Sequence, residues 1–313
     1  MRKRRHYQGF RKFSIKTRLM IALLMISIIP LAGISSYSFH IFSVALRAKL
    51  SASISQTLSM INLNMVSEIE KYQYLCGSIC VSQEIKDGLM NKDMTDMEKN
   101  KAITEIQSMI RSKIIYPAQA KNITVYDTDG NIFYDLGYDG FYQEDVDMLL
   151  SRLETETGDV WAYVHTYRDR DILVLGRRIY EQYNQSRVIG YTLISIDEKI
   201  FSKTVLEPIG LADSSNIMYL NTDGTILSSW DRKVGMGQKA DEELLENIEN
   251  RLPKKTDSFS IDENGQEQLV TYIFNKNLNQ LFVYTMPYHY INSEVHTLLK
   301  RILIVAVFLV LLC

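Results

Sequence analysis

The first hydrophobic feature of the chain is an uncharged run from Leu19 to Phe42, which follows eight Lys/Arg within residues 1–18. About 20 helical residues span the hydrocarbon core of a bilayer, and a single proline is tolerated in a membrane helix. The run therefore predicts a transmembrane helix over residues 19–42, with residues 1–18 as a basic cytoplasmic tail. A cleaved signal peptide has the same charged start and apolar middle, but here a helical pattern continues directly after the run.

Apolar residues then recur every three or four positions, which is the period of an α-helix. This stripe comprises Leu46, Leu50, Ile54, Leu58, Ile61, Met65, Ile69, Tyr72 and Cys76. No proline or glycine occurs from Ser35 to Cys76. The pattern predicts one long stalk helix over residues 43–90. A helix of this length favours packing against two successive domains, or against the stalk of a partner, over packing on a single core.

A second apolar run, Ile302–Cys313, closes the sequence. Its twelve residues make about 18 Å of helix, whereas the hydrocarbon core of a bilayer is about 30 Å thick. We interpret residues 298–313 as the start of a second transmembrane helix that is truncated here, and the chain as the front part of a longer protein.

One pattern occurs twice between the two apolar runs. The segment ITVYDTDGNIFYD (Ile123–Asp135) returns as IMYLNTDGTILSS (Ile217–Ser229). Each copy predicts two strands joined by a TDG turn, in which glycine adopts the positive φ. An acidic helical segment and three strand-like segments follow each copy. This order predicts an α+β fold with two tandem antiparallel-sheet units, at residues 91–210 and 211–297.

The charge distribution supports a membrane location. All 37 Asp/Glu lie between Glu68 and Glu294, so a basic tail precedes an acidic body. A nucleic-acid-binding protein carries its basic charge on a folded face, whereas here it adjoins a hydrophobic run. The expected partner is therefore the cell membrane and not nucleic acid. We expect residues 43–297 to be extracytoplasmic.

The sequence contains no motif of a catalytic or metal site. It has no phosphate-binding glycine loop, nucleophile elbow or zinc-protease helix motif. The five histidines lack metal-ligand spacing, so we expect no metal, cofactor or catalytic domain in this chain. The TDG segments resemble the opening of a calcium loop but lack its later glycine and glutamate, which favours a turn. Cys76 and Cys80 are interpreted as buried apolar residues, with a bond between two stalks as the alternative.

The segment Asp159–Tyr167 (DVWAYVHTY) carries the candidate ligand site. In a strand, alternate residues share a face, which places four rings on one side. These are Trp161, Tyr163, His165 and Tyr167. Flat apolar rings with polar groups suit a small-molecule pocket. One of Arg177 and Arg178 on the next strand must face the same side, and a buried guanidinium needs an anion, either a ligand carboxylate or Asp197. The alternative is that the rings pack beneath the acidic helix Glu144–Glu154 and the arginine is solvated.

Taken together, these segments resemble the double Cache sensor module of bacterial receptors. Those most similar to YesM-type sensor histidine kinases are FSIKTRLMIALLMISIIP (Phe13–Pro30), LVLGRRIY (Leu173–Tyr180), VIGYTLISIDEKIF (Val188–Phe201) and MPYHYI (Met286–Ile291). The resemblance implies two PAS-like units, a small-molecule pocket in the membrane-distal unit, and a homodimer. It also implies that a kinase part, missing from this chain, signals to a response regulator.

The resemblance also implies a ligand class, from which this sequence departs. Double Cache domains that bind amino acids carry Arg-x-Trp-Tyr and a later Asp. Trp161 and Asp197 match that pattern, but Asp159 and Ala162 occupy the Arg and Tyr positions. Arg177 is the candidate for the missing cation. Two other functions remain as alternatives: the sensor part of a chemotaxis receptor, and a membrane-tethered small-molecule binding protein.

Overall fold

The computed structural model describes residues 14–91, 94–113, 120–137, 140–184, 186–206, 215–252, 254–263, 265–276, 278–288, 300–301 and 304. Most of the predicted basic tail and of the second membrane helix lies outside these residues. Residues Ser53–Tyr290 form a compact unit that contains both sheets of the protein.

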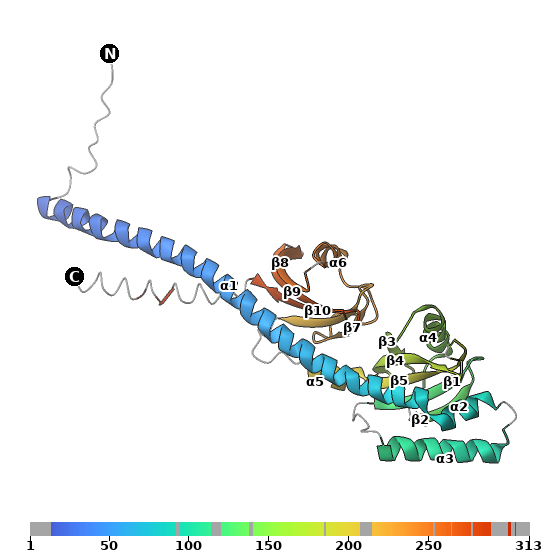
Figure 1. The fold of residues 1–313 in the computed structure, drawn as a ribbon. Helices are drawn as coiled ribbons and strands as arrows, with labels where there is room; N and C mark the ends of the chain where they lie inside the picture. Colours follow the sequence, from blue (N-terminus) through green and yellow to red (C-terminus); the bar gives the residue numbers. More distant parts are fainter. Residues whose placement is uncertain are drawn as a thin grey trace. The chain divides into compact units, whose positions relative to one another are not determined.

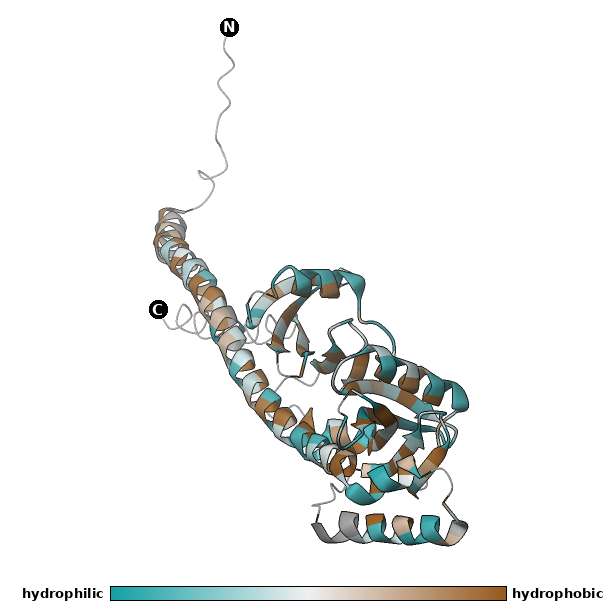
Figure 2. Cartoon of the chain, turned by 45° about the vertical axis from the view of Figure 1, so that its right-hand side comes forward, coloured by the Kyte–Doolittle hydropathy of each residue, from teal (hydrophilic) through white to brown (hydrophobic). Residues whose placement is uncertain are grey.

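The N-terminal element is α1 (Ile15–Val81), so the predicted membrane helix and stalk form one continuous helix of 67 residues (Figure 1). Within the described residues, α1 is the one helix long and apolar enough to cross a membrane, over Ile28–Val81. Its N-terminal part exposes large apolar side chains such as Leu19, Leu23 and Ile26. Hydrophobic residues recur along this part of α1 (Figure 2). An exposed apolar surface of this length suits contact with lipid.

The predicted stripe on the stalk is buried from Ile54 to Cys76. The helix then ends at Val81 rather than at residue 90, because Ser82 interrupts it. The backbone of Ser82 is extended, and its hydroxyl accepts a hydrogen bond of 3.4 Å from the amide of Ile85. A serine that caps a free amide in this way starts a new helix, α2 (Gln83–Met90).

Two five-stranded antiparallel sheets follow, which confirms the predicted α+β class with two tandem units. The first sheet has the order β2-β1-β5-β4-β3, and the second has the equivalent order β7-β6-β10-β9-β8. The strands are β1 (Ala120–Asp127), β2 (Ile132–Gly137), β3 (Val160–Thr166), β4 (Arg170–Tyr180), β5 (Val188–Asp197), β6 (Asn216–Asn221), β7 (Ile226–Ser229), β8 (Thr256–Glu263), β9 (Gln266–Asn275) and β10 (Gln280–Pro287). The other helices are α3 (Asp96–Lys113), α4 (Gln143–Thr155), α5 (Glu198–Val205) and α6 (Glu242–Glu249).

Both TDG segments form hairpin turns. Gly130 and Gly224 adopt φ angles of 79° and 85°, a region that an L-residue enters at a cost. The carboxylate of Asp127 accepts hydrogen bonds from the amides of Asp129 (2.9 Å) and Asn131 (2.8 Å). A side chain that closes its own turn in this way stabilises the hairpin without a bound ion.

Helices cover the two sheets in the same manner. Helix α4 packs on the first sheet, where Leu149 and Leu153 join a core with Val174. Helix α6 packs on the second sheet, where Leu244 contributes to a core with Val270. Helix α1 extends along both sheets (Figure 1). Asn275 on β9 donates a hydrogen bond of 3.2 Å to Asn62 of α1, and Gln73 of α1 donates one of 2.8 Å to Asp159, which directly precedes β3.

Candidate functional site

Strand β3 presents two different faces, as its alternating sequence predicts. Ala162 and Val164 belong to the core beneath α4. Because alternate residues point in opposite directions, Trp161, Tyr163 and His165 face the other side. The alternative interpretation, in which the rings pack beneath the acidic helix, therefore does not hold for Trp161 and Tyr163.

Of the two adjacent arginines on β4, Arg177 shares the face of Trp161. The register pairs Trp161 with Leu175, and Arg177 lies two positions further along the same strand. Arg178 points to the face of α4, where its Nη2 donates a hydrogen bond to the carbonyl of Glu156. The structure thus identifies which arginine lies on the side of the rings.

The anionic partner of Arg177 is Asp159, which directly precedes β3, and not Asp197. The guanidinium donates two parallel hydrogen bonds to this carboxylate, from Nε at 2.5 Å and from Nη2 at 2.8 Å. Asp197 has other partners: it accepts a bond of 3.1 Å from the amide of Ile200 and lies 3.7 Å from the ammonium of Lys121. Of the two predicted anions for this guanidinium, a ligand carboxylate or Asp197, the second is therefore wrong.

The Arg177–Asp159 pair also binds α1. Arg177 Nη1 donates to the carbonyl of Gln73 at 3.4 Å, and Gln73 Nε2 donates to Asp159 at 2.8 Å. The forked bond to Asp159 raises the pKa of Arg177 above its ordinary value. The three residues form a closed network that fixes the first sheet on the helix.

The four predicted rings do not gather at one point. Trp161 is only 4% exposed, whereas Tyr167 at the far end of the segment is 54% exposed. Tyr167 contacts Tyr142 edge to face, with ring centroids 5.8 Å apart. Between them, Tyr163 and His165 share a carboxylate that the sequence did not suggest.

That carboxylate belongs to Asp171 on β4. The Tyr163 hydroxyl donates to it at 2.5 Å, and Nδ1 of His165 lies 3.1 Å from the same oxygen. Burial, and then the bond to Asp171, raise the pKa of Tyr163. The hydrogen bond to Asp171 raises the pKa of His165, and Asp169 adds to this effect. The protonated form of His165 therefore stabilises the folded protein. This stabilisation is fully present at pH values below the pKa of an unfolded histidine, about 6.5, and is lost as the pH rises through the higher pKa of His165 in the folded protein.

Replacing Asp171 with asparagine is expected to lower the pKa of His165 towards its ordinary value, because the main hydrogen bond to the imidazolium is weakened. An NMR titration of the protein with labelled histidine measures this shift. Asp127→Asn, in the β1–β2 turn, serves as a control that leaves the pKa of His165 unchanged. An unaltered His165 titration in the Asp171 variant would show that the hydrogen bond does not control its charge.

Two cavities lie beside the Arg177–Asp159 pair, and both are lined by Gly158 and Asp159. The first has a volume of about 580 Å³, and its lining includes Cys80, Lys86, Arg177, Arg178 and Glu181. The second has a volume of about 430 Å³, and its lining includes Gln73, Arg152, Trp161, Asn221 and Gln280. Ligand pockets of small molecules fall within this size range. Of the six predicted ligand residues, Arg177 borders the first cavity and Trp161 borders the second.

The first cavity has an excess of positive charge. Its two carboxylates already have partners, since Asp159 binds Arg177 and Glu181 lies 3.4 Å from Arg187. Lys86 lines the cavity from α2 and forms no ion pair with any residue that the structure describes. A bound anionic group would neutralise this ammonium and would also accept hydrogen bonds from the neighbouring Arg178. The sequence analysis did not single out Lys86.

A third cavity of about 340 Å³ lies on the second sheet beneath α6. Apolar residues such as Met218 and Leu244 line it together with the carboxylates of Asp231 and Asp241. Both carboxylates accept hydrogen bonds from nearby backbone amides.

The two cysteines of α1 are free and buried. Burial raises the pKa of the Cys76 thiol, and Cys80 close by adds to this effect. In the described part of the chain, no three His, Cys, Asp or Glu side chains are grouped to hold a metal ion.

No protein-family model matches the chain, and no curated protein matches it. Solved structures do match. The extracellular domain of a protein described as a histidine kinase, rpHK1S-Z16, is 13% identical with a TM-score of 0.54, over 78% of this chain and 98% of that domain. The sensor domain of the V. cholerae histidine kinase DctB is 10% identical with a TM-score of 0.51, over 76% and 97%. The ligand-binding domain of Mlp24 with asparagine is 13% identical with a TM-score of 0.54, over 81% and 98%.

This chain has the double Cache fold. The predicted resemblance is thereby confirmed at the level of the fold, including the two equivalent sheets and the long N-terminal helix. At these identities the double Cache likeness concerns the fold alone, so the asparagine bound to Mlp24 is a property of Mlp24.

Proposed function

We propose that this chain is the extracytoplasmic, ligand-sensing part of a membrane-anchored receptor. The observation that carries the proposal is α1, in which an exposed apolar segment continues without interruption into a stripe buried beside both sheets. A rigid helix of this kind connects a ligand-binding unit mechanically with a bilayer. The two-sheet fold shared with sensor domains of histidine kinases and chemoreceptors supports the same function.

The ligand we propose is a small molecule with an anionic group, bound in the first cavity. Lys86 and Arg178 would contact the anion, while Arg177, held by Asp159, would position the wall of the cavity. The buried Trp161 would stabilise the wall, at Gly158 and Asp159, that the first cavity shares with the second. The predicted contacts by Tyr163, His165, Tyr167 and Asp197 are not part of this proposal, because each side chain already has a partner elsewhere.

A thermal-shift screen of the full chain with small carboxylic acids and organic phosphates tests the site. A ligand at a hundred times its dissociation constant stabilises a protein by about 2.7 kcal/mol. We expect Lys86→Gln to abolish the shift of any stabilising compound without changing the melting temperature of the free protein. Lys101→Gln, the same change on α3, is the matched control and should retain the shift. A shift that persists in Lys86→Gln and disappears in Asp241→Asn would place the ligand beneath α6 instead.

For the output we propose a histidine kinase, which the N-terminal resemblance of the sequence favours over a chemotaxis receptor. A homodimer and a response regulator would then be its partners. The sequence encoded after Cys313 distinguishes the two: a phosphorylated histidine region with an ATP-binding domain supports the kinase, and a long methylated coiled coil supports the chemoreceptor.

A further inference from the structure

Glu198 is a charged residue that the solvent does not reach. It follows β5 of the first sheet and begins α5, and its exposed fraction is 0%. A carboxylate on the first turn of a helix is favoured by the helix dipole, but a buried charge also needs partners that compensate for its lost hydration.

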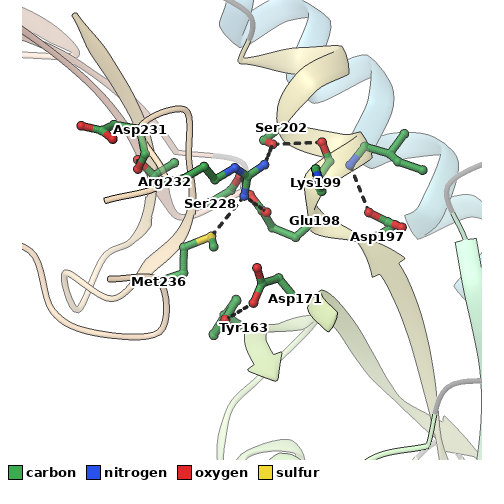
Figure 3. Close-up of polar contacts among 12 residues, drawn as sticks. Tyr163, Asp171, Asp197, Glu198, Lys199, Ser202, Ser228, Asp231, Arg232 and Met236 are labelled. Carbon is green, nitrogen blue, oxygen red and sulfur yellow. Dashed lines mark hydrogen bonds and ion pairs between the residues drawn. The ribbon is translucent and has the colours of Figure 1, made fainter. Parts of the chain in front are cut away.

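The partners of Glu198 come from the second sheet (Figure 3). Ser228, on β7, donates its hydroxyl at 2.5 Å, and Arg232, in the loop after β7, donates from Nη1. The other arm of Arg232, Nη2, donates to Ser202, one turn further along α5. The guanidinium thus binds two successive turns of α5 and holds the loop of the second sheet against them.

Apolar contacts accompany this ion pair. Phe201 on α5 lies 6.4 Å from the ring of Tyr219 on β6, which stacks in turn on Phe282 at 5.1 Å. In the same loop as Arg232, Gly237 adopts a φ of 77°, and an added Cβ there would lie 2.7 Å from the Tyr163 ring. Helix α5 therefore packs on both sheets, on β4 and β5 of the first and on β7 of the second.

We infer that the buried Glu198–Arg232 pair couples the two sheets into one cooperative unit, so that a change in the first sheet reaches the second through α5. The inference goes beyond ligand sensing and holds whichever cavity binds a ligand. Removing either partner leaves the other without its ion pair within the contact, which favours separation of the loop from α5.

Each sheet region contains one tryptophan, so the two can be followed one at a time. Trp161 lies on β3 of the first sheet, and Trp230 directly follows β7 of the second. The full chain is studied in detergent micelles. The Trp230→Phe variant keeps Trp161 as the single tryptophan, in the first sheet, and the Trp161→Phe variant keeps Trp230, next to the second. Urea unfolding followed by fluorescence then gives one midpoint for each sheet. The perturbation is Leu149→Ala, which opens a cavity in the first core, since Leu149 on α4 is fully buried against the first sheet.

With the pair intact, Leu149→Ala is expected to lower both midpoints by the same amount. In a Glu198→Gln background it should lower the Trp161 midpoint and leave the Trp230 midpoint unmoved. Arg232→Gln should likewise separate the two unfolding midpoints, and it replaces Glu198→Gln in the experiment if that variant does not fold. Glu105→Gln, which removes an exposed ion pair with Lys101 on α3, is the control and should keep the midpoints together. Equal shifts of both reporters in the Glu198 and Arg232 variants would overturn the inference, because a merely structural pair lowers both midpoints alike.

Discussion

Replacing Trp161 with alanine is expected to lower the free energy of unfolding by about 3–5 kcal/mol. The side chain is 4% exposed, so its removal forfeits the burial of a large ring and leaves a cavity in the first sheet. Urea unfolding of the full chain in detergent micelles, followed by circular dichroism, measures the change. Trp230→Ala is the matched control, since Trp230 is only partly buried and its removal should cost less.

A different result would indicate that Trp161 belongs to the ligand site. If its removal changes the unfolding free energy by less than that of Trp230 and abolishes ligand stabilisation, the ring is a wall of the binding site and not part of the core.

Arg177→Ala is expected to cost about 3 kcal/mol, the lower end of the range for breaking a buried ion pair. The variant leaves the carboxylate of Asp159, which is 12% exposed, without its forked partner, and it removes one bond to Gln73 on α1. The same unfolding experiment measures the loss.

The neighbouring arginine provides the control for this variant. Among the residues that the structure describes, the guanidinium of Arg178 donates only to a backbone carbonyl, so Arg178→Ala should cost no more than about 1 kcal/mol. Equal losses for the two variants would show that the network with Asp159 and Gln73 contributes little beyond general packing.

The elements with strong periodic or turn signals were predictable from the sequence. The stripe that begins at Leu46 indicated a helix that packs along two domains, and its buried part does so from Ile54. The repeated TDG segments predicted two equivalent hairpins, because a positive φ at Gly130 and Gly224 is encoded locally. The break at Ser82 was not predicted, because a serine within a helical pattern caps a new helix only when the chain turns there.

The partner of Arg177 was within reach of the sequence but was missed. Counting residues outward from the turn after β3 places Asp159 directly opposite Arg177, yet Asp159 was noted only as a departure from a family pattern. The cavity beside this pair was out of reach. Its lining comes from α1, α2 and the end of β4, and no local pattern brings Lys86 next to Arg178.

The Glu198–Arg232 pair shows the same limit. Each residue is ordinary in its local sequence, an acidic first turn of a helix and an arginine in a loop after a strand. Only the packing of α5 on the second sheet buries the carboxylate and brings the guanidinium to it.

The orientation of the chain in the membrane tests the account most directly. A variant with Cys313 replaced by alanine receives one new cysteine, at Lys12 in the basic tail or at Tyr183, which is 91% exposed in the first unit. Intact bacterial cells that produce each variant are treated with a membrane-impermeant maleimide. The account predicts that Tyr183→Cys is labelled in intact cells and that Lys12→Cys is labelled only after lysis. Labelling of Lys12→Cys in intact cells, with Tyr183→Cys protected until lysis, would contradict an extracytoplasmic sensor.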